Sequence, residues 1–117
     1  MALQQILDVT ATLNSSALNE VKLDVGGYDY AIVHAVNPAG TLNFTTTNDG
    51  GAVQGAGDGN PTASINYVAV QGTNLGTGSG VTSLAASGLV RFGYIGQYLR
   101  LNGTTVDKCI VRLFKIN

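Results

Sequence analysis

The amino-acid sequence predicts an all-β protein, an antiparallel β-sandwich of Greek-key or jelly-roll type with about eight short strands. Short runs of β-branched and aromatic residues recur at intervals of roughly 8–12 residues, which is typical of such folds. Glycine, asparagine and threonine separate these runs, and 16 of the 117 residues are glycine, about twice the average usage. No stretch keeps a sustained helical period, so helix is limited to one short N-terminal turn that Leu3, Ile6 and Leu7 allow.

The strands in the first half of the chain follow from their apolar spacing. Residues 18–25 alternate apolar and charged side chains toward their end, which predicts a half-buried strand. Residues 28–36 form a nearly continuous apolar and aromatic run, which predicts a central strand covered on both faces. The Asn-Pro-Ala-Gly sequence at 37–40 is a turn, and a third strand follows at 41–47.

The second half combines glycine-rich connections with further short strands. Residues 48–62 and 72–80 are rich in glycine and predict two flexible connections. A strand at 64–71 lies between them. The remaining predicted strands are residues 81–84, 89–95, 98–102 and 109–116.

The length indicates a single core, which we assign to residues 15–117, preceded by an N-terminal arm at residues 1–14. The arm carries more apolar side chains than a free terminus needs. We therefore expect it to dock on a partner chain. Its predicted contact residues are Leu3, Ile6, Leu7, Val9 and Leu13.

The charge balance excludes several partner classes. The formal net charge is −1 and only 11% of residues are charged, against an ordinary value of about 25%. Without clustered lysine and arginine, neither nucleic acid nor an anionic membrane is an expected partner. No apolar run approaches the ~18 residues of a membrane span, and the N-terminus lacks the pattern of a secretory signal peptide.

The residues available for catalysis or for binding metal are few. The sequence has one histidine, one cysteine, one glutamate and six aspartates, and it lacks the G-x-S-x-G motif of a nucleophile elbow. His34 lies in mid-strand among apolar residues, which favours a core or subunit-interface histidine over a catalytic base. One cysteine and one histidine cannot complete a zinc site. We therefore expect no enzyme activity.

The loop at 48–62 has residues that a calcium or phosphate site could use. Asn48, Asp49, Asp58 and Asn60 could each supply an oxygen ligand, but their spacing differs from that of an EF-hand loop. Asp-Gly and Asn-Gly pairs are also common turn formers, and this interpretation is favoured. The glycines do not form a G-x-G-x-x-G or Gly-Lys-Ser/Thr motif. No metal and no cofactor is predicted.

Several polar and aromatic side chains are predicted to face outward. Leu99 and Leu101 take the inward face of their strand, which leaves Tyr98 and Arg100 for a glycan or a neighbouring subunit. The loop residues Asn48, Asp49 and Asp58 would join them in a glycan-binding surface. Arg91 and Arg112 interrupt apolar strands. We expect both at surface or interface positions, because an unpaired buried charge is costly.

Three segments resemble small β-sandwich proteins of tailed-bacteriophage virions. They are YDYAIV at 28–33, GTLNFTTTNDG at 40–50 and LVRFGYIGQYLRL at 89–101. The resemblance covers most of the chain from about Leu18 onward, and its motifs are structural. It implies a capsid decoration (cement) protein, or a module of a head or tail fibre.

The resemblance also implies a homo-oligomer, commonly a trimer, that contacts the major capsid protein or another virion protein. The protein would be synthesised and assembled in the host cytoplasm and function in the virion. A carbohydrate-binding module of a head or tail fibre is the alternative function. A third, weaker hypothesis is a small hydrolase that uses His34.

Overall fold

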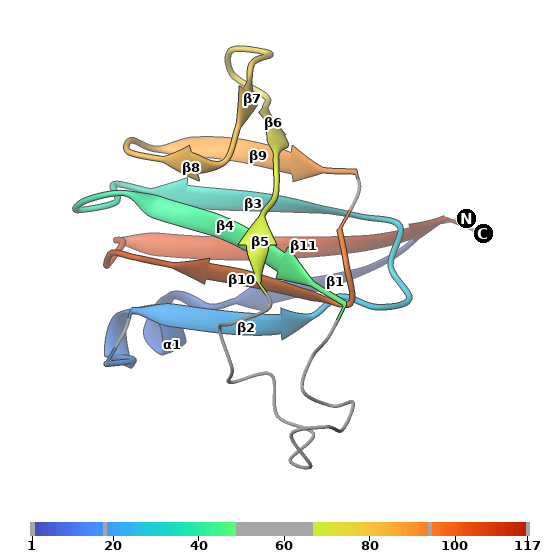
Figure 1. The fold of residues 1–117 in the computed structure, drawn as a ribbon, viewed down its shortest axis with the longest axis horizontal. Coiled ribbons are helices and arrows are strands. Elements are labelled where there is room, and N and C mark those ends of the chain that lie inside the picture. The colour runs from blue at the N-terminus through green and yellow to red at the C-terminus, as the bar shows by residue number, and fades with distance from the viewer. Residues whose placement is uncertain (1, 18, 49–66, 94, 117) are drawn as a thin grey trace.

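The computed structural model describes residues 2–17, 19–48, 67–93 and 95–116, with the side chains of residues 2 and 3 excepted. In this part of the chain it contains eleven strands and one helix (Figure 1). The elements are β1 (Ala2–Asp8), α1 (Thr10–Ser15), β2 (Glu20–Asp24), β3 (Tyr30–Val36), β4 (Leu42–Thr47), β5 (Val68–Ala69), β6 (Gly72–Asn74), β7 (Gly80–Val81), β8 (Ser83–Leu84), β9 (Gly88–Phe92), β10 (Tyr98–Asn102) and β11 (Lys108–Ile116).

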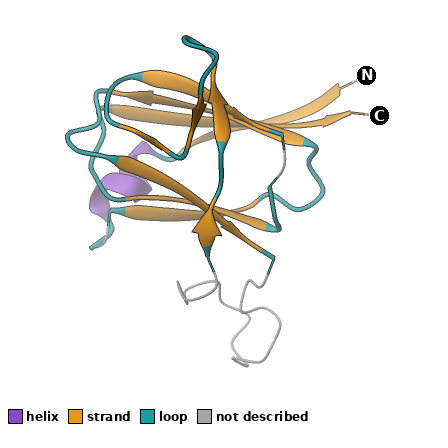
Figure 2. Ribbon diagram, turned by 45° about the horizontal axis from the view of Figure 1, so that its top comes forward, coloured by secondary structure: helices purple, strands orange, loops and turns teal. Residues whose placement is uncertain are grey.

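The strands form two antiparallel sheets that pack face to face (Figures 1 and 2). Sheet A has six strands in the order β1-β11-β3-β9-β6-β7. Sheet B has five, in the order β2-β10-β4-β5, with β8 also paired to β4. This arrangement confirms the predicted all-β antiparallel sandwich. The strand count exceeds the prediction because β1 lies in the segment assigned to an arm, β6 lies in the connection predicted at 72–80, and the strand predicted at 81–84 is divided into β7 and β8.

The core lies between the sheets and is built from alternate residues of each strand. Leu99 and Leu101 of β10 and Phe44 of β4 are fully buried, as is Phe92 of β9. The rings of Phe44 and Phe92 meet edge to face, with centroids 5.0 Å apart, and join the two sheets at the centre. The period of two positions in the sequence therefore sets which side chains enter the core.

The N-terminal residues belong to the sandwich, and their assignment to a separate arm before a domain at 15–117 is wrong. Strand β1 pairs with β11 along its whole length, from Ala2 opposite Ile116 to Asp8 opposite Ile110, so both termini lie side by side (Figure 1). Helix α1 contacts β2 of sheet B and β11 of sheet A. It closes one end of the sandwich (Figure 2).

The predicted arm residues consequently divide between the core and the surface. Val9 is 5% exposed and Leu13 is fully buried in the core of their own chain, so these two cannot anchor a partner. Leu7 packs partly against the same core. Ile6 is 53% exposed and stays available for docking, whereas the side chain of Leu3 lies outside the described part.

Strand β3 differs from its prediction in one respect that matters for function. Ala31, Val33 and Ala35 are fully buried against sheet B. The residues between them face outward, and no second layer of described residues covers them: His34 is exposed and Ile32 only half-buried. The apolar run at 28–36 therefore reflects an apolar outer surface of the sheet, which the sequence pattern alone cannot distinguish from burial on both sides.

Candidate functional site

The candidate site is the outer face of sheet A. Successive side chains of a strand point to opposite sides of the sheet, so the residues between the core positions face outward. The antiparallel registers set Arg112 between Ile6 of β1 and Ile32 of β3. We define the outer face of sheet A by the side chains of Ile6, Asp8, Tyr30, Ile32, His34, Leu89, Arg91, Lys108, Ile110, Arg112 and Phe114.

This face exposes large apolar side chains. Ile6 on β1 is 53% exposed, while on the other side of β11 and β3 Leu89 is 40% exposed and Leu75 beside it is 48% exposed. The backbone N–H of Leu75 donates to the carbonyl oxygen of Leu89 at 2.8 Å, which keeps the two residues adjacent. Adjacent exposed apolar side chains such as Leu75 and Leu89 mark interaction sites on soluble proteins more often than isolated exposed residues do.

The same face carries a cation that lies over an aromatic ring. The rings of Tyr30 and Phe114 stack with centroids 4.6 Å apart and an interplanar angle of 8°. The Arg91 guanidinium lies 4.5 Å from the centroid of the Tyr30 ring, which holds it at the surface by a cation–π contact. Arg112 lies on β11, on the other side of β3 from Arg91.

Asp8, on edge strand β1, is the single carboxylate among the residues that define this face. Its Oδ1 accepts hydrogen bonds from the hydroxyl of Thr10 at 2.7 Å and from the Thr10 backbone N–H at 3.0 Å. These bonds, and to a lesser extent the Lys108 charge, lower the pKa of Asp8. The Asp8 carboxylate thus already accepts hydrogen bonds from the first residue of α1.

A hollow lies in the middle of the face. It has a volume of about 350 Å³ and is lined by Ile32, His34, Leu89, Ile110 and Arg112. A second hollow of about 480 Å³ shares His34 and Leu89 and continues toward Leu75. We call the two together the sheet A groove; its centre is apolar and Arg112 lies at one end.

The groups weighed for catalysis are not assembled into a catalytic set. His34 is exposed on the groove, so it is not a core histidine, and no described side chain hydrogen bonds to it. Burial, with a contribution from the charge of Asp8, raises the pKa of Cys109 to about 12, which keeps its thiol neutral. Among the described residues, no three His, Cys, Asp or Glu side chains gather as a metal site would require.

Tyr98 and Arg100 lie on the face of sheet B opposite the core, but Tyr98 is half-buried, and the Arg100 side chain is only 13% exposed and already has partners. Its Nε lies 2.7 Å from Oε2 of Glu20, and Lys22 Nζ lies 3.3 Å from Oε1 of the same carboxylate. Its guanidinium also lies 5.6 Å from the centroid of the Tyr67 ring. A glycan would have to compete with these contacts.

The pKa of Glu20 reflects this arrangement. Burial opposes ionisation of its carboxyl, but the hydrogen bond from Arg100 and the charges of Arg100 and Lys22 outweigh that effect. The pKa of Glu20 is therefore lowered, and the cluster stays ionic at neutral pH.

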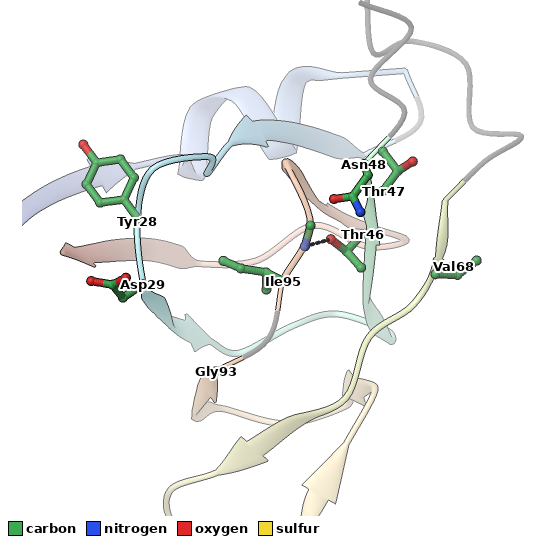
Figure 3. A pocket seen from close by; sticks show the side chains of 9 residues that line it. Tyr28, Asp29, Thr46, Thr47, Asn48, Val68, Gly93 and Ile95 are labelled. Atoms are coloured by element: carbon green, nitrogen blue, oxygen red, sulfur yellow. Dashed lines mark hydrogen bonds between the residues drawn. The ribbon is translucent and has the colours of Figure 1, made fainter. Parts of the chain in front are cut away.

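A further hollow, about 470 Å³, is lined by Tyr28, Asp29, Thr46, Thr47, Asn48, Val68, Gly93, Ile95 and Gly96 (Figure 3). Its polar groups largely serve the fold. The Tyr28 hydroxyl donates to Gln5 at 2.8 Å, and an Asp29 oxygen accepts from the Ile116 N–H at 2.5 Å. Thr46 accepts from the Gly96 N–H at 2.7 Å, as Figure 3 shows.

The predicted glycan-binding residues are only partly brought together. Asn48 lines the hollow of Figure 3, and its Oδ1 accepts from the Gln97 backbone N–H at 3.0 Å. Tyr98 is half-buried on β10 and does not line that hollow. Asp49 and Asp58 lie outside the described residues. A glycan-binding role for this set stays a prediction.

The sequence does not show that the residues on the outer face of sheet A share one face. Arg91 and Arg112 were expected at the surface or an interface, and Ile6 was expected to contact a partner. The residues that join them, Ile32, Leu89 and Ile110, look like ordinary core positions in an apolar strand. The available signal was an arginine inside each of two apolar strands that turn out to flank β3.

Comparison with known proteins identifies a shared fold. No family model matches the sequence, and no curated protein matches it. The crystal structure of SPBc2 prophage-derived protein YomS superposes with a TM-score of 0.67 at 12% sequence identity, covering 98% of this chain and 96% of that chain. Both chains thus have the same fold over nearly their full length. No helix in the described part is long and apolar enough to cross a bilayer.

Proposed function

We propose that this chain is a non-enzymatic structural protein of a tailed-bacteriophage virion, and specifically a capsid decoration protein that binds the capsid surface and stabilises it. The observation that carries the proposal is the outer face of sheet A, where exposed Ile6 and Leu89 accompany the cations Arg91 and Arg112. A large, rigid, apolar face is what a protein needs to adhere to a lattice.

Two further observations support the assignment to a phage. A solved structure with the same fold is that of a prophage-derived protein, and the segments at 28–33, 40–50 and 89–101 resemble phage virion sandwiches. By the same resemblance, the partner is the major capsid protein or another virion protein, and the protein is a homo-oligomer, with a trimer favoured.

Stabilisation of the capsid would follow from linkage. A protein that binds assembled capsid but not dissociated subunits stabilises the assembly by RT ln(1 + [L]/Kd), where [L] is the concentration of the free protein. At a concentration of 100 times Kd this is about 2.7 kcal/mol per site. Such an effect requires adhesion and a rigid scaffold, both of which the sandwich offers, and it needs no catalytic group.

The proposal is tested with purified capsids. Added protein is expected to sediment with them, to appear in mass spectra of virions and to raise the temperature at which capsids open. Protein absent from virions and unable to bind capsids would refute the proposal.

A carbohydrate-binding module is the second candidate, favoured by the aromatic ring, carboxylate and amide that Tyr28, Asp29 and Asn48 bring to the hollow of Figure 3. Such groups are the usual means of holding a sugar. Glycan-array binding, with or without calcium, that is lost in Asn48→Ala would support this function. An array without hits would remove it.

A further inference from the structure

We propose that the outer face of sheet A binds a surface of opposite charge, in which carboxylates surround an apolar side chain that enters the sheet A groove. The inference rests on the proposed function, in which that surface belongs to a capsid protein. It adds the chemical character of the partner, which the fold by itself does not give.

The charge of the face is unbalanced. Within the described part, the ion pairs closer than 4.0 Å join Glu20 to Lys22 and Arg100 on sheet B. On the outer face of sheet A, neither Arg91 nor Arg112 has a carboxylate of a described residue at that distance. A guanidinium that is buried in an interface without a carboxylate is costly, since its desolvation is not compensated. A stable partner must therefore bring carboxylates.

The shape of the face sets the position of an anchor. The groove centre is lined by Ile32, Leu89 and Ile110, with Arg112 at one end. Binding energy in interfaces is concentrated where a side chain fills a desolvated pocket ringed by polar contacts. An apolar side chain would fill the groove, and an Asp or Glu beside it would pair with Arg112.

A second copy of this face is a poor occupant. A two-fold contact brings the same patch of both subunits together, so two surfaces with the same excess of cations would be buried against each other. Asp8 lies at the edge and its Oδ1 already accepts two hydrogen bonds from Thr10. Like charges held together in an interface cost several kcal/mol, which directs the face toward a different, acidic surface.

The first experiment measures capsid affinity for matched variants. Arg112→Glu is expected to weaken binding at least about tenfold, while Lys115→Glu, which makes the same change of net charge on β11 outside this face, leaves it near wild type. Leu89→Ser, at a 40% exposed position, is expected to weaken binding, and Val68→Ser, at a 62% exposed position of sheet B, is not. Thermal unfolding of each variant verifies that it folds.

The second experiment identifies the occupant. A photo-crosslinking residue at position 110 is irradiated in purified virions, and the attached peptide is sequenced. A capsid peptide containing Asp or Glu supports the inference. A second copy of this chain, a peptide without acidic residues, or no crosslink overturns it.

The outcomes separate the inference from the proposed function. Wild-type protein that fails to bind capsids overturns the proposed function and the inference with it. Wild-type protein that binds, together with Arg112→Glu and Leu89→Ser variants that bind equally well, overturns the inference and leaves the function standing.

Discussion

Replacing Leu13 by alanine tests whether the N-terminal residues belong to the core or dock on another chain. Leu13 is fully buried. The next residue of α1, Asn14, fixes the helix to residue 106: its side-chain amide donates to the Val106 carbonyl oxygen at 2.8 Å and accepts from the Val106 N–H at 2.9 Å. A helix held this firmly cannot collapse into the cavity left by the substitution. The expected loss is therefore in the ordinary range for a buried leucine, about 2–5 kcal/mol.

The shift in melting temperature follows from the chain length. An unfolding entropy near 2.1 cal/mol/K per residue gives about 0.25 kcal/mol/K for 117 residues. Leu13→Ala should thus lower Tm by about 8–20 °C, measured by calorimetry or circular dichroism. The control is Ile6→Ala, at a position 53% exposed, for which a change below about 1 kcal/mol is expected. A Leu13→Ala protein as stable as wild type that binds capsids poorly would refute the placement of Leu13 and restore the docking arm.

Three further predictions concern other parts of the sandwich. In Gly72→Ala the new Cβ would lie 2.5 Å from Val90 Cγ1, so the free energy of unfolding, measured in urea, should fall by about 1–3 kcal/mol. The control is Gly93→Ala, which has open space around it and should change that free energy little. If both variants were equally stable, the packing of Gly72 against Val90 would be contradicted. The pKa of Glu20 is lower in the folded protein than its ordinary value of 4.5, so the ionised carboxylate contributes its full stability above pH 4.5 and loses that contribution as the pH falls below this value. Glu20→Gln should therefore make Tm fall less steeply in acid. A dependence of Tm on pH identical to that of wild type would contradict the ion pair. Cys109, with its pKa raised to about 12, should react with Ellman's reagent only after unfolding, and rapid labelling of native protein would show that it is accessible.

Much of the fold could be predicted because alternation sets the faces of a strand. The expected strand at 98–102 coincides with β10, and the strand at 109–116 differs from β11 by one residue. In both, apolar side chains at every second position enter the core. The three-residue strand β6, which lies in the connection predicted at 72–80, contains too few residues to show such a period.

The N-terminal segment could not be placed because its pairing is non-local. Strand β1 is joined to β11 at the opposite end of the chain, with Ala2 opposite Ile116. Apolar residues that cover their own core and apolar residues that cover a partner look alike in sequence. The same ambiguity made the 28–36 run resemble a strand buried on both faces.

The candidate site was only partly foreseeable for a related reason. Alternation along the strand places Tyr98 and Arg100 on the outer side of the sheet. The pairing of Arg100 with Glu20, however, depends on the register of β10 against β2. Arg91 and Arg112 stand out as charges in apolar strands. Their assembly around Ile32 requires β3 to lie between β9 and β11, an order that strand patterns do not encode.

Electron cryomicroscopy of capsids prepared with and without the protein tests the central claim most directly. We predict added density on the capsid exterior, into which the sandwich fits with the outer face of sheet A against acidic residues of the capsid protein. A sandwich bound with that face open to solvent, or capsids without added density, would contradict the account.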